Sequence, residues 1–168
     1  MGFIMKFKKE LIANYSFKDF NNNNVYLSDL FNDKKELLLI HNMGKQCPYC
    51  TMWADGFNGV LKHLEDKVSF AVISKDSPKI QKEFYLKRRW KFKMLSAKDN
   101  SFMKDMGFEN KKGGPLPGVS VFQKNKEGKI FRVAKDEFDI GDNYCIVWHF
   151  FDLLPSGSKD WEPKFDYD

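Results

Sequence analysis

The segment Cys47-Pro48-Tyr49-Cys50 contains the residues whose types and spacing most directly suggest chemistry. Two thiols separated by two residues can close into a small disulfide, which opens again by exchange with other thiols. The chain has three cysteines, and two of them lie in this segment. The spacing therefore predicts a redox pair that exchanges electrons with other thiols and disulfides.

The surroundings of the pair predict different roles for its two cysteines. Cys47 follows an apolar strand and a short loop and opens a helix, where free backbone N–H groups stabilise a thiolate. Cys50 precedes Trp53 by three residues, which places it on the buried side of that helix. We therefore predict that Cys47 attacks an external disulfide and that Cys50 resolves the mixed disulfide.

Three neighbouring residues are predicted to support the pair. Pro48 suits the first turn of a helix, because the backbone N–H groups there have no partner within the helix. The missing N–H of proline therefore costs no hydrogen bond. Tyr49 is predicted to point outward, where it can contact a partner, and Trp53 is predicted to support the site from the buried side.

Pro117 is a further candidate, because it stands directly before a predicted strand that should pair centrally, where proline is normally excluded. We predict that its peptide bond is cis and that it faces the disulfide. The backbone of Leu116 would then be free to pair with an extended substrate. The alternative is an ordinary loop proline, since Gly113, Gly114 and Pro115 already mark a turn.

His41 ends the predicted strand, six residues before Cys47. An imidazole titrates near neutrality, so this side chain is a candidate to move protons for Cys50. The alternative is a hydrogen-bonded histidine of the core.

A zinc site is the competing interpretation of the two cysteines. Cys47, Cys50 and His63 match the first three ligands of a site with two cysteines and two histidines. The fourth ligand would fall at positions 67–69, where the chain has no histidine. We therefore predict no metal site and no bound cofactor. Cys145 is predicted to be a small buried apolar residue.

The apolar pattern predicts the elements that position these residues. Residues 37–41 are apolar without alternation, which is typical of a strand covered on both faces. The next segment has apolar residues at helical spacing, which predicts an amphipathic helix; they include Trp53, Phe57, Val60 and Leu64. The remaining predicted elements are strands at 68–74 and 92–96, helices at 77–90, 102–106 and 143–154, and hairpins formed by 15–17 with 25–27 and by 118–122 with 129–134.

This order of elements predicts an α/β fold with a central mixed β-sheet flanked by helices. Gly56 and Gly59 lie inside the helix that follows the cysteines. Each weakens a helix interior by about 1 kcal/mol relative to alanine, so we expect close contact with the sheet or a bend there.

Composition and charge indicate how many domains the chain forms and which kinds of partner it is expected to lack. A chain of 168 residues that is 42% hydrophobic supports one domain with a substantial core. The net charge of +5 is spread along the chain, so we predict no nucleic-acid partner. No apolar stretch is long enough to span a membrane, and the apolar run at residues 1–5 is too short for a secretory signal. We therefore expect a cytoplasmic protein with no membrane partner, in which a structural disulfide would be kept reduced.

Several segments together resemble a known family. They are 47–50, 53–57, 117–122 and 151–155. The set is similar to a bacterial thioredoxin-like family of unknown function whose members are predicted to be dithiol-disulfide oxidoreductases. The resemblance implies a thioredoxin-like fold with an N-terminal β-hairpin, a redox pair at Cys47 and Cys50, and a protein or small-molecule disulfide or dithiol as partner.

The resemblance runs from about Tyr15 to Trp161. We accordingly expect an N-terminal extension at residues 1–14, a thioredoxin-like domain at 15–161 and a C-terminal tail at 162–168.

Two alternatives to a disulfide oxidoreductase stay open. One is a thiol peroxidase of peroxiredoxin type, although that motif has threonine or serine three residues before the reactive cysteine, where this chain has Gly44. The other is a non-catalytic thioredoxin-like interaction module, in which the aromatic C-terminal helix binds a partner.

Overall fold

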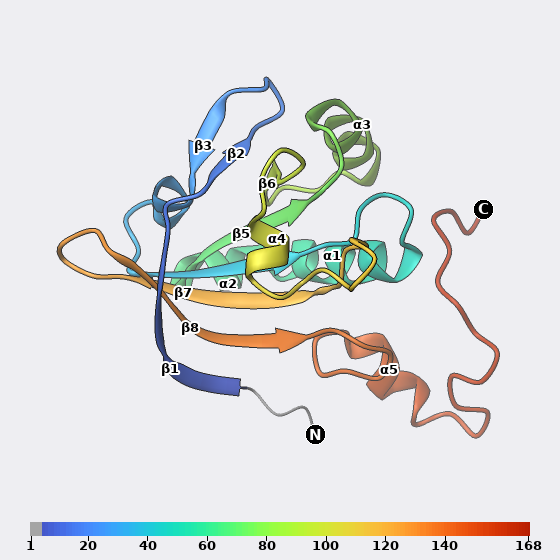
Figure 1. Ribbon diagram of the computed structural model, residues 1–168. Helices are drawn as coiled ribbons and strands as arrows, with labels where there is room; N and C mark the ends of the chain where they lie inside the picture. Colours follow the sequence, from blue (N-terminus) through green and yellow to red (C-terminus); the bar gives the residue numbers. More distant parts are fainter. Residues whose placement is uncertain (1–4) are drawn as a thin grey trace.

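The computed structural model describes residues 5–168. The chain forms an 8-stranded mixed sheet with the strand order β1-β8-β7-β4-β5-β6-β2-β3 (Figure 1). The strands are β1 (Met5–Ile12), β2 (Ser16–Lys18), β3 (Asn24–Tyr26), β4 (Glu36–His41), β5 (Ser69–Ser74), β6 (Lys93–Ser96), β7 (Gly118–Lys124) and β8 (Ile130–Glu137). The helices are η1 (Leu27–Phe31), a 3-10 helix, α1 (Pro48–Gly59), α2 (Leu61–Lys67), α3 (Pro78–Arg88), α4 (Phe102–Asp105) and α5 (Ile146–Phe151). No helix of this described part is long and apolar enough to cross a membrane.

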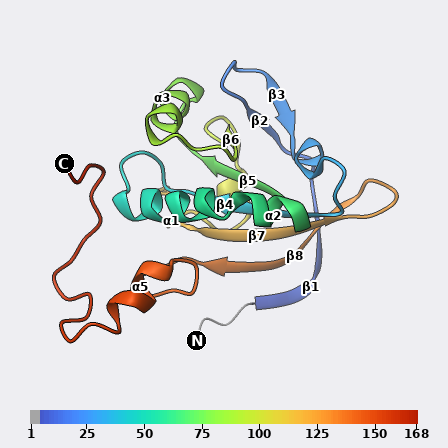
Figure 2. The ribbon, with the colours of Figure 1, turned by 180° about the vertical axis from the view of Figure 1, so that it is seen from behind.

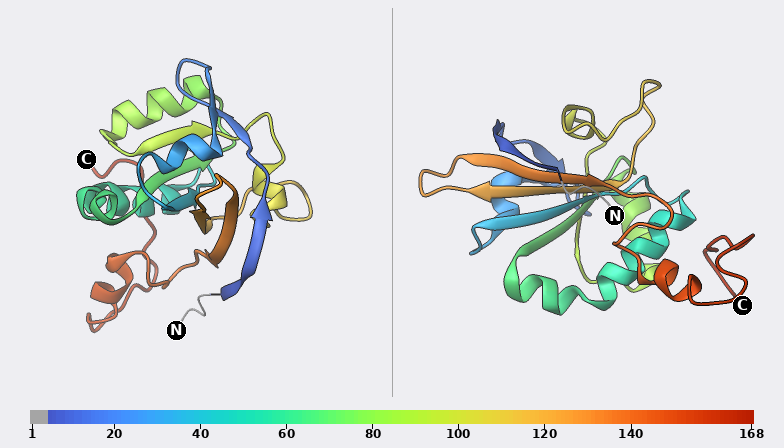
Figure 3. Two further views of the ribbon diagram at one scale, coloured as in Figure 1. Left: turned by 90° about the vertical axis from the view of Figure 1, so that its left-hand side faces the viewer. Right: turned by 90° about the horizontal axis from the view of Figure 1, so that it is seen from below.

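Strand β4 lies at the centre of the sheet and leads into the cysteine segment. It pairs in parallel with β5 and antiparallel with β7, so that Leu39 lies opposite both Ala71 and Ser120. Helices α1, α2, α3 and α5 lie on one side of the sheet and α4 lies on the other (Figures 2 and 3). The strand is apolar without alternation because both of its faces are covered, as the sequence predicts.

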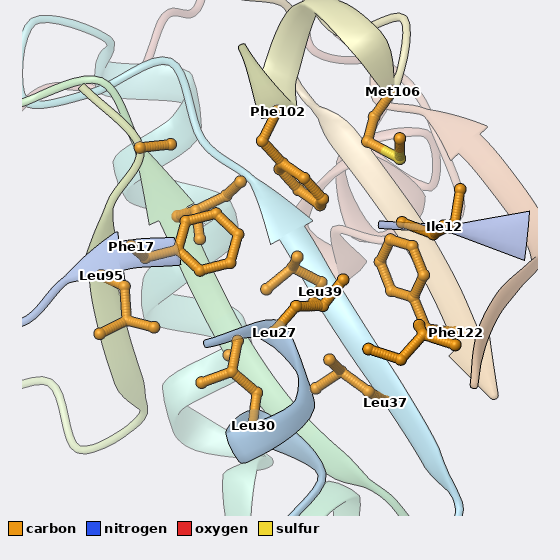
Figure 4. Close-up of a cluster of buried hydrophobic side chains, with 14 of the residues drawn as sticks. Ile12, Phe17, Leu27, Leu30, Leu37, Leu39, Leu95, Phe102, Met106 and Phe122 are labelled. Carbon is orange, nitrogen blue, oxygen red and sulfur yellow. The ribbon is translucent and has the colours of Figure 1, made fainter. Parts of the chain in front are cut away.

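Each face of the sheet carries its own apolar core. Leu37, Leu39 and Phe122 belong to the core on the α4 side, where Phe102 packs over them (Figure 4). Ile40 belongs to the core on the α1 side, together with Cys50 and the aromatic side chains around it. The second cysteine of the pair is therefore part of a hydrophobic core.

The helix predicted after the cysteines is two helices with a bend between them. Helix α1 ends at Gly59 and α2 begins at Leu61, and the intervening Val60 N–H still donates to the Gly56 carbonyl at 3.3 Å. A Cβ added at Gly56 or Gly59 would meet no atom of the sheet within 4 Å, so close contact is wrong as the explanation of these glycines. The other alternative, a bend, agrees with the interruption of the helix at Val60. Val60 is 47% exposed and does not continue the buried stripe.

The predicted N-terminal hairpin is confirmed. Strands β2 and β3 pair antiparallel, and Lys18 pairs with Ser96 of β6, which joins the hairpin to the edge of the main sheet. Asp19 shapes the turn, because its Oδ1 accepts the N–H groups of Asn21 and Asn23 at 2.8 and 2.9 Å.

Two terminal features differ from the sequence expectation. Strand β1, which was not predicted, pairs antiparallel with β8 and forms the opposite edge of the sheet. Helix α5 is shorter than the predicted helix at 143–154. After α5 the chain returns past the start of α1 toward α3 (Figure 1), where Arg88 Nη1 donates to the Phe165 carbonyl at 2.6 Å.

Candidate active site

The cysteine segment forms the first turn of α1, as its sequence predicts. Cys47 is the N-cap, and its Sγ accepts the backbone N–H of Cys50 at 3.1 Å. Pro48 is the first helical residue, and Thr51 Oγ1 donates to the Cys47 carbonyl at 3.0 Å. The sulfur of Cys47 therefore lies where unpaired N–H groups of a helix start stabilise negative charge.

The two thiols of the pair have unequal surroundings. Cys47 is half-buried, whereas Cys50 is 2% exposed, and both are free thiols. A side-chain hydrogen bond from Cys50, together with the backbone N–H groups of Cys50 and Tyr49, lowers the pKa of Cys47 to about 7 against the opposing effect of burial. The same side-chain hydrogen bond and burial raise the pKa of Cys50. Near neutral pH the outer sulfur is therefore about half thiolate, while the inner one keeps its proton.

Tyr49 lies between the pair and the C-terminal segment. Its ring stacks on Trp148 with the centroids 6.2 Å apart, and Trp148 in turn contacts Trp161 edge-on at 5.9 Å. Tyr49, Trp161 and Pro163 are among the residues that line an open groove of about 580 Å³. Tyr49 is thus half-buried at one wall of a groove beside the pair.

Trp53 anchors α1 to the segment between β8 and α5. Its Nε1 donates to Asp142 Oδ1 at 3.3 Å, and its ring packs against Phe138 with the centroids 5.4 Å apart. Burial raises the pKa of Asp142. Asp142 could not be predicted as a partner of Trp53, because no local motif links it to a tryptophan that lies 89 positions away.

The ring of His41 is fully buried on the α4 side of β4. Its Nε2 is 2.8 Å from Ser120 Oγ, and the ring stacks on Phe108 and Phe102 with centroid distances of 3.9 and 5.8 Å. Burial, assisted by the nearby positive charges of Arg132 and Lys135, lowers the pKa of His41 well below its usual range. Nδ1 has no hydrogen-bond partner within residues 5–168. The imidazole is therefore a neutral group held by the core.

Pro117 lies beside Cys50, but its peptide bond is not cis. A narrow cavity is lined by Cys50, His41 and Pro117, among others, so these three predicted site residues are neighbours. No peptide bond is cis in the described part of the chain, so the cis prediction for Leu116–Pro117 is wrong.

Backbone hydrogen bonds on both sides hold Leu116 and Pro117 in place, with a trans peptide bond between them. The Leu116 N–H donates to the Phe108 carbonyl at 2.9 Å, and the Pro117 carbonyl accepts the Phe138 N–H at 3.1 Å. The Leu116 N–H is therefore taken, so the prediction that its backbone pairs with an extended substrate is limited to its carbonyl.

Asn42 shapes the loop that carries Cys47 and was also missed. Its Oδ1 accepts the Gly44 N–H at 2.8 Å, and its Nδ2 donates to the Cys50 carbonyl at 3.4 Å. Gly44 has a φ of +104°, a conformation that favours glycine. An asparagine two residues before a glycine, directly after a strand, is the sequence signal of such a turn.

The described residues contain no group of three or more His, Cys, Asp or Glu side chains that could hold a metal ion. Cys145 is 5% exposed, and burial raises the pKa of its thiol.

Comparison with solved structures places the chain in the thioredoxin-like fold. Peroxidoxin BcpB from Mycobacterium tuberculosis is 22% identical, with a TM-score of 0.63 over 79% of this chain and 86% of that one. A cysteine-to-serine mutant of PrxQ from Xylella fastidiosa is 18% identical, with a TM-score of 0.63 over 79% and 86%. Reduced Prx3 from Vibrio vulnificus in complex with hydrogen peroxide is 18% identical, with a TM-score of 0.62 over 80% and 86%. Identities this low show the shared fold.

The comparison of sequences assigns the family. No curated protein matches the chain. The family model described as "Bacterial protein of unknown function (DUF899)" matches residues 7–166, which is nearly the whole chain. The protein whose paired cysteines open helix α1 of a thioredoxin-like fold is therefore a member of this bacterial family.

Proposed function

We propose that the protein is a thiol-disulfide oxidoreductase in which Cys47 is the nucleophile and Cys50 is the resolving thiol. The observation that carries the proposal is the opposite direction of the two pKa shifts within one helical turn. Near neutral pH about half of the Cys47 thiol is ionised, whereas the Cys50 thiol one helical turn further on keeps its proton.

The reaction begins when the Cys47 thiolate attacks one sulfur of a substrate disulfide. A bond forms between Cys47 and that sulfur, and the other substrate sulfur leaves as a thiolate that takes up a proton. Cys47 then no longer carries the negative charge that raises the pKa of Cys50. The Cys50 thiol can therefore lose its proton more easily at this stage than in the reduced protein.

Resolution completes the transfer of two electrons. The Cys50 thiol loses its proton and attacks Cys47 Sγ, the mixed disulfide breaks, and the second substrate sulfur leaves as a thiolate that takes up a proton. The protein holds a Cys47–Cys50 disulfide at this point. A dithiol reductant opens this disulfide by the same exchange and becomes oxidised in turn. The proposal places this cycle in the cytoplasm, where thiol reductants are maintained.

The groove beside Tyr49 supports a protein or small-molecule disulfide as the substrate. It is lined by the aromatic rings of Tyr49 and Trp161 and by the polar side chains of Glu162 and Lys164. An aromatic wall supplies contact area, while mixed charges can pair with a polar partner. In this proposal the groove holds the substrate while its disulfide reaches Cys47, and the substrate backbone pairs with the Leu116 carbonyl next to Pro117, which lies beside Cys50.

A thiol peroxidase is the second candidate, and the peroxiredoxins among the similar structures favour it. In that reaction the Cys47 thiolate attacks a peroxide oxygen and forms a sulfenic acid with loss of water or an alcohol. Cys50 then condenses with the sulfenic acid, and a second water leaves as the disulfide forms. The absence of a hydroxyl side chain at Gly44 is the feature that ranks this candidate second.

The two candidates are separated by parallel assays on purified protein. The first assay follows dithiothreitol-dependent reduction of insulin disulfides, and the second follows thiol oxidation by micromolar hydrogen peroxide. We expect turnover of insulin that is abolished by Cys47→Ser and retained by Cys145→Ser, the matched control for loss of one thiol. The Cys50→Ser variant should lose turnover and accumulate mixed disulfides.

Each remaining outcome has a defined meaning. Rapid oxidation of Cys47 by peroxide with negligible insulin reduction would favour the peroxidase. Insulin reduction by Cys47→Ser at the wild-type rate would exclude the proposed chemistry. A protein that is inactive in both assays and cannot form the Cys47–Cys50 disulfide would instead be an interaction module.

A further inference from the structure

An apolar cavity of about 390 Å³ lies between the sheet and helices α1 and α2. Phe57, Val60 and Leu64 line it from the helices, and Val119, Val121 and Ala134 line it from β7 and β8. Val121 and Ala134 are paired neighbours on the two strands. The volume is within the range of roughly 300–1,000 Å³ that is typical of small-molecule sites.

The cavity follows from the way the helices cover this face. Helix α1 bends into α2 at Val60, so the two helices follow β4 and β5 rather than crossing toward β8. Helix α5 contains 6 residues and lies beyond the end of β8 (Figure 2). The apolar side chains of β7 and β8 therefore keep open space above them.

The cavity opens between the helix bend and the segment before α5. Val60 is 47% exposed and Asn143 is exposed, and both line the cavity. The described lining includes neither Cys47 nor Cys50, so a ligand can occupy this cavity independently of the proposed thiol chemistry.

The charge at the cavity is negative. Asp136 and Lys135 are the two charged residues of the lining. The Lys135 amine lies 5.9 Å from the centroid of the Phe108 ring, which belongs to the core on the α4 side. The Asp136 carboxylate remains on the cavity side, where its Oδ2 accepts the Tyr144 hydroxyl at 2.6 Å.

We propose that this cavity binds an uncharged aromatic molecule of about two fused rings that carries one hydroxyl or amine donor. An engineered apolar cavity of about 150 Å³ binds benzene, so 390 Å³ accommodates a larger aromatic body. The apolar walls exclude a hydrated charge, and the Asp136 carboxylate accepts a hydrogen bond from the donor while repelling an anion.

The test uses N-phenyl-1-naphthylamine, an uncharged aromatic amine whose fluorescence rises in apolar surroundings. Displacement of this probe is compared for 2-naphthol and 2-naphthoate, which share the ring body and differ in charge. We expect 2-naphthol to displace the probe at a concentration at least about tenfold lower than 2-naphthoate. Equal displacement by the two compounds would overturn the proposed ligand class.

Variants locate the site. Ala134→Phe fills the floor, and Val60→Trp obstructs the exposed mouth, where a larger side chain leaves the core packing intact. Each should weaken probe binding by about tenfold or more. Ala13→Phe adds the same side chain at an exposed position in the connection between β1 and β2 and should leave binding unchanged.

A thermal unfolding curve shows whether the Ala134→Phe variant is folded. If that variant does not fold, Val60→Trp still tests whether the probe binds in the cavity. Asp136→Asn should narrow the difference between 2-naphthol and 2-naphthoate, because it removes the negative charge and retains an acceptor. Wild-type probe affinity in the folded filling variants, or no probe binding to the wild-type protein, would overturn the proposal.

Discussion

The hydrogen bonds around Cys47 determine which of the two cysteines ionises first. The Cys50 side chain is the largest cause of the lowered pKa of Cys47, and the backbone N–H groups of the helix start add to it. The hydrogen bond to Cys47, together with burial, raises the pKa of Cys50, so the thiolate forms on the outer sulfur. In the proposed mechanism, the residue that resolves the mixed disulfide is thus also the residue that lowers the pKa of the nucleophile.

Replacement of Cys50 should change the acidity of Cys47 in a way that depends on the new side chain. Cys50→Ala removes the side-chain donor and should raise the pKa of Cys47 toward its usual value of 9.0. Cys50→Ser keeps a hydroxyl donor and should preserve more of the lowered value. The measurement is the pH dependence of alkylation by iodoacetamide, followed by mass spectrometry in a Cys145→Ser background.

The direction of this pH dependence is fixed by the reacting species. Alkylation requires the thiolate, so its rate falls as the pH decreases through the pKa of Cys47. The midpoint should lie near pH 7 before replacement and at higher pH in Cys50→Ala. The same midpoint in both proteins would show that the backbone N–H groups act alone.

For single residues, the sequence predicts features that depend on near neighbours in the chain. The spacing of Cys47, Pro48 and Cys50 predicts a helix that starts at Cys47 and a buried Cys50, and both features are confirmed. Asp142 could not be predicted, because its contact with Trp53 depends on how the chain after β8 returns to α1. The catalytic roles of the two cysteines stay predictions.

At the level of helices and strands, tight turns and close backbone contacts position the two cysteines. Gly44 allows the loop after β4 to reverse with a positive φ, which brings Cys47 to the start of α1. Gly118 begins β7 opposite His41 of β4 and Glu137 of β8. A Cβ at Gly118 would lie 2.2 Å from Phe108 Cε1 and 2.4 Å from the Asp136 carbonyl oxygen. The strand beside the pair therefore depends on the absence of a side chain.

Two glycine-to-alanine substitutions should have opposite effects on stability. Gly118→Ala should lower the free energy of unfolding by about 3 kcal/mol, because backbone and ring must both move. Gly56→Ala should raise it by about 0.5–1 kcal/mol, because the position is helical and open, and alanine restricts the unfolded chain. Urea unfolding followed by circular dichroism measures both. Destabilisation by Gly56→Ala would contradict the open surroundings of that residue.

The regular elements were predictable because their apolar patterns are strong. The strand at 37–41, the helix capped by Ser77 and the hairpin of β7 and β8 are confirmed, with boundaries that differ by a few residues. Strand β1 was missed because its sequence mixes lysines with apolar residues, and its place depends on pairing with β8. The trans bond before Pro117 was missed because the hydrogen bonds that hold this segment come from residues on both sides of β7.

For the molecule as a whole, the fold couples the ionisation of Cys47 to stability. Folding lowers the pKa of Cys47 from 9.0 to about 7, so between these values the unfolded chain binds more protons than the folded one. The free energy of unfolding should therefore rise with pH across this window, and the contribution is lost as the pH falls through 7. Above about pH 9 the raised pKa of Cys50 acts in the opposite direction.

The expected size of the rise is modest. A shift of two pKa units corresponds to at most about 2.7 kcal/mol, and partial exposure of Cys47 reduces this to about 1 kcal/mol. Urea unfolding of the reduced protein at pH 7 and pH 8.5 measures the rise, and Cys47→Ser should remove it. Equal pH slopes for the wild-type protein and Cys47→Ser would contradict the lowered pKa.

The C-terminal segment completes the molecule around the pair. Trp161 contacts Phe151 edge-on with the centroids 4.8 Å apart, and Phe165 contacts Phe84 of α3 at 6.1 Å. Residues near both ends of the sequence thus take part in the fold, since β1 forms one edge of the sheet and the tail lies beside α1 and α3. The groove next to Tyr49 exists only because this return is in place.

The most direct test of the central claim is the intact mass of the wild-type protein and of variants that lack one cysteine of the pair, after brief exposure to oxidised glutathione. Cys50→Ser should carry one glutathione on Cys47, whereas the wild-type protein should lose two hydrogens and carry no adduct, because Cys50 displaces the glutathione. Cys47→Ser should remain unmodified at Cys50. A stable adduct on the wild-type protein, or equal labelling of Cys50 in Cys47→Ser, would contradict the account of an attacking Cys47 and a resolving Cys50.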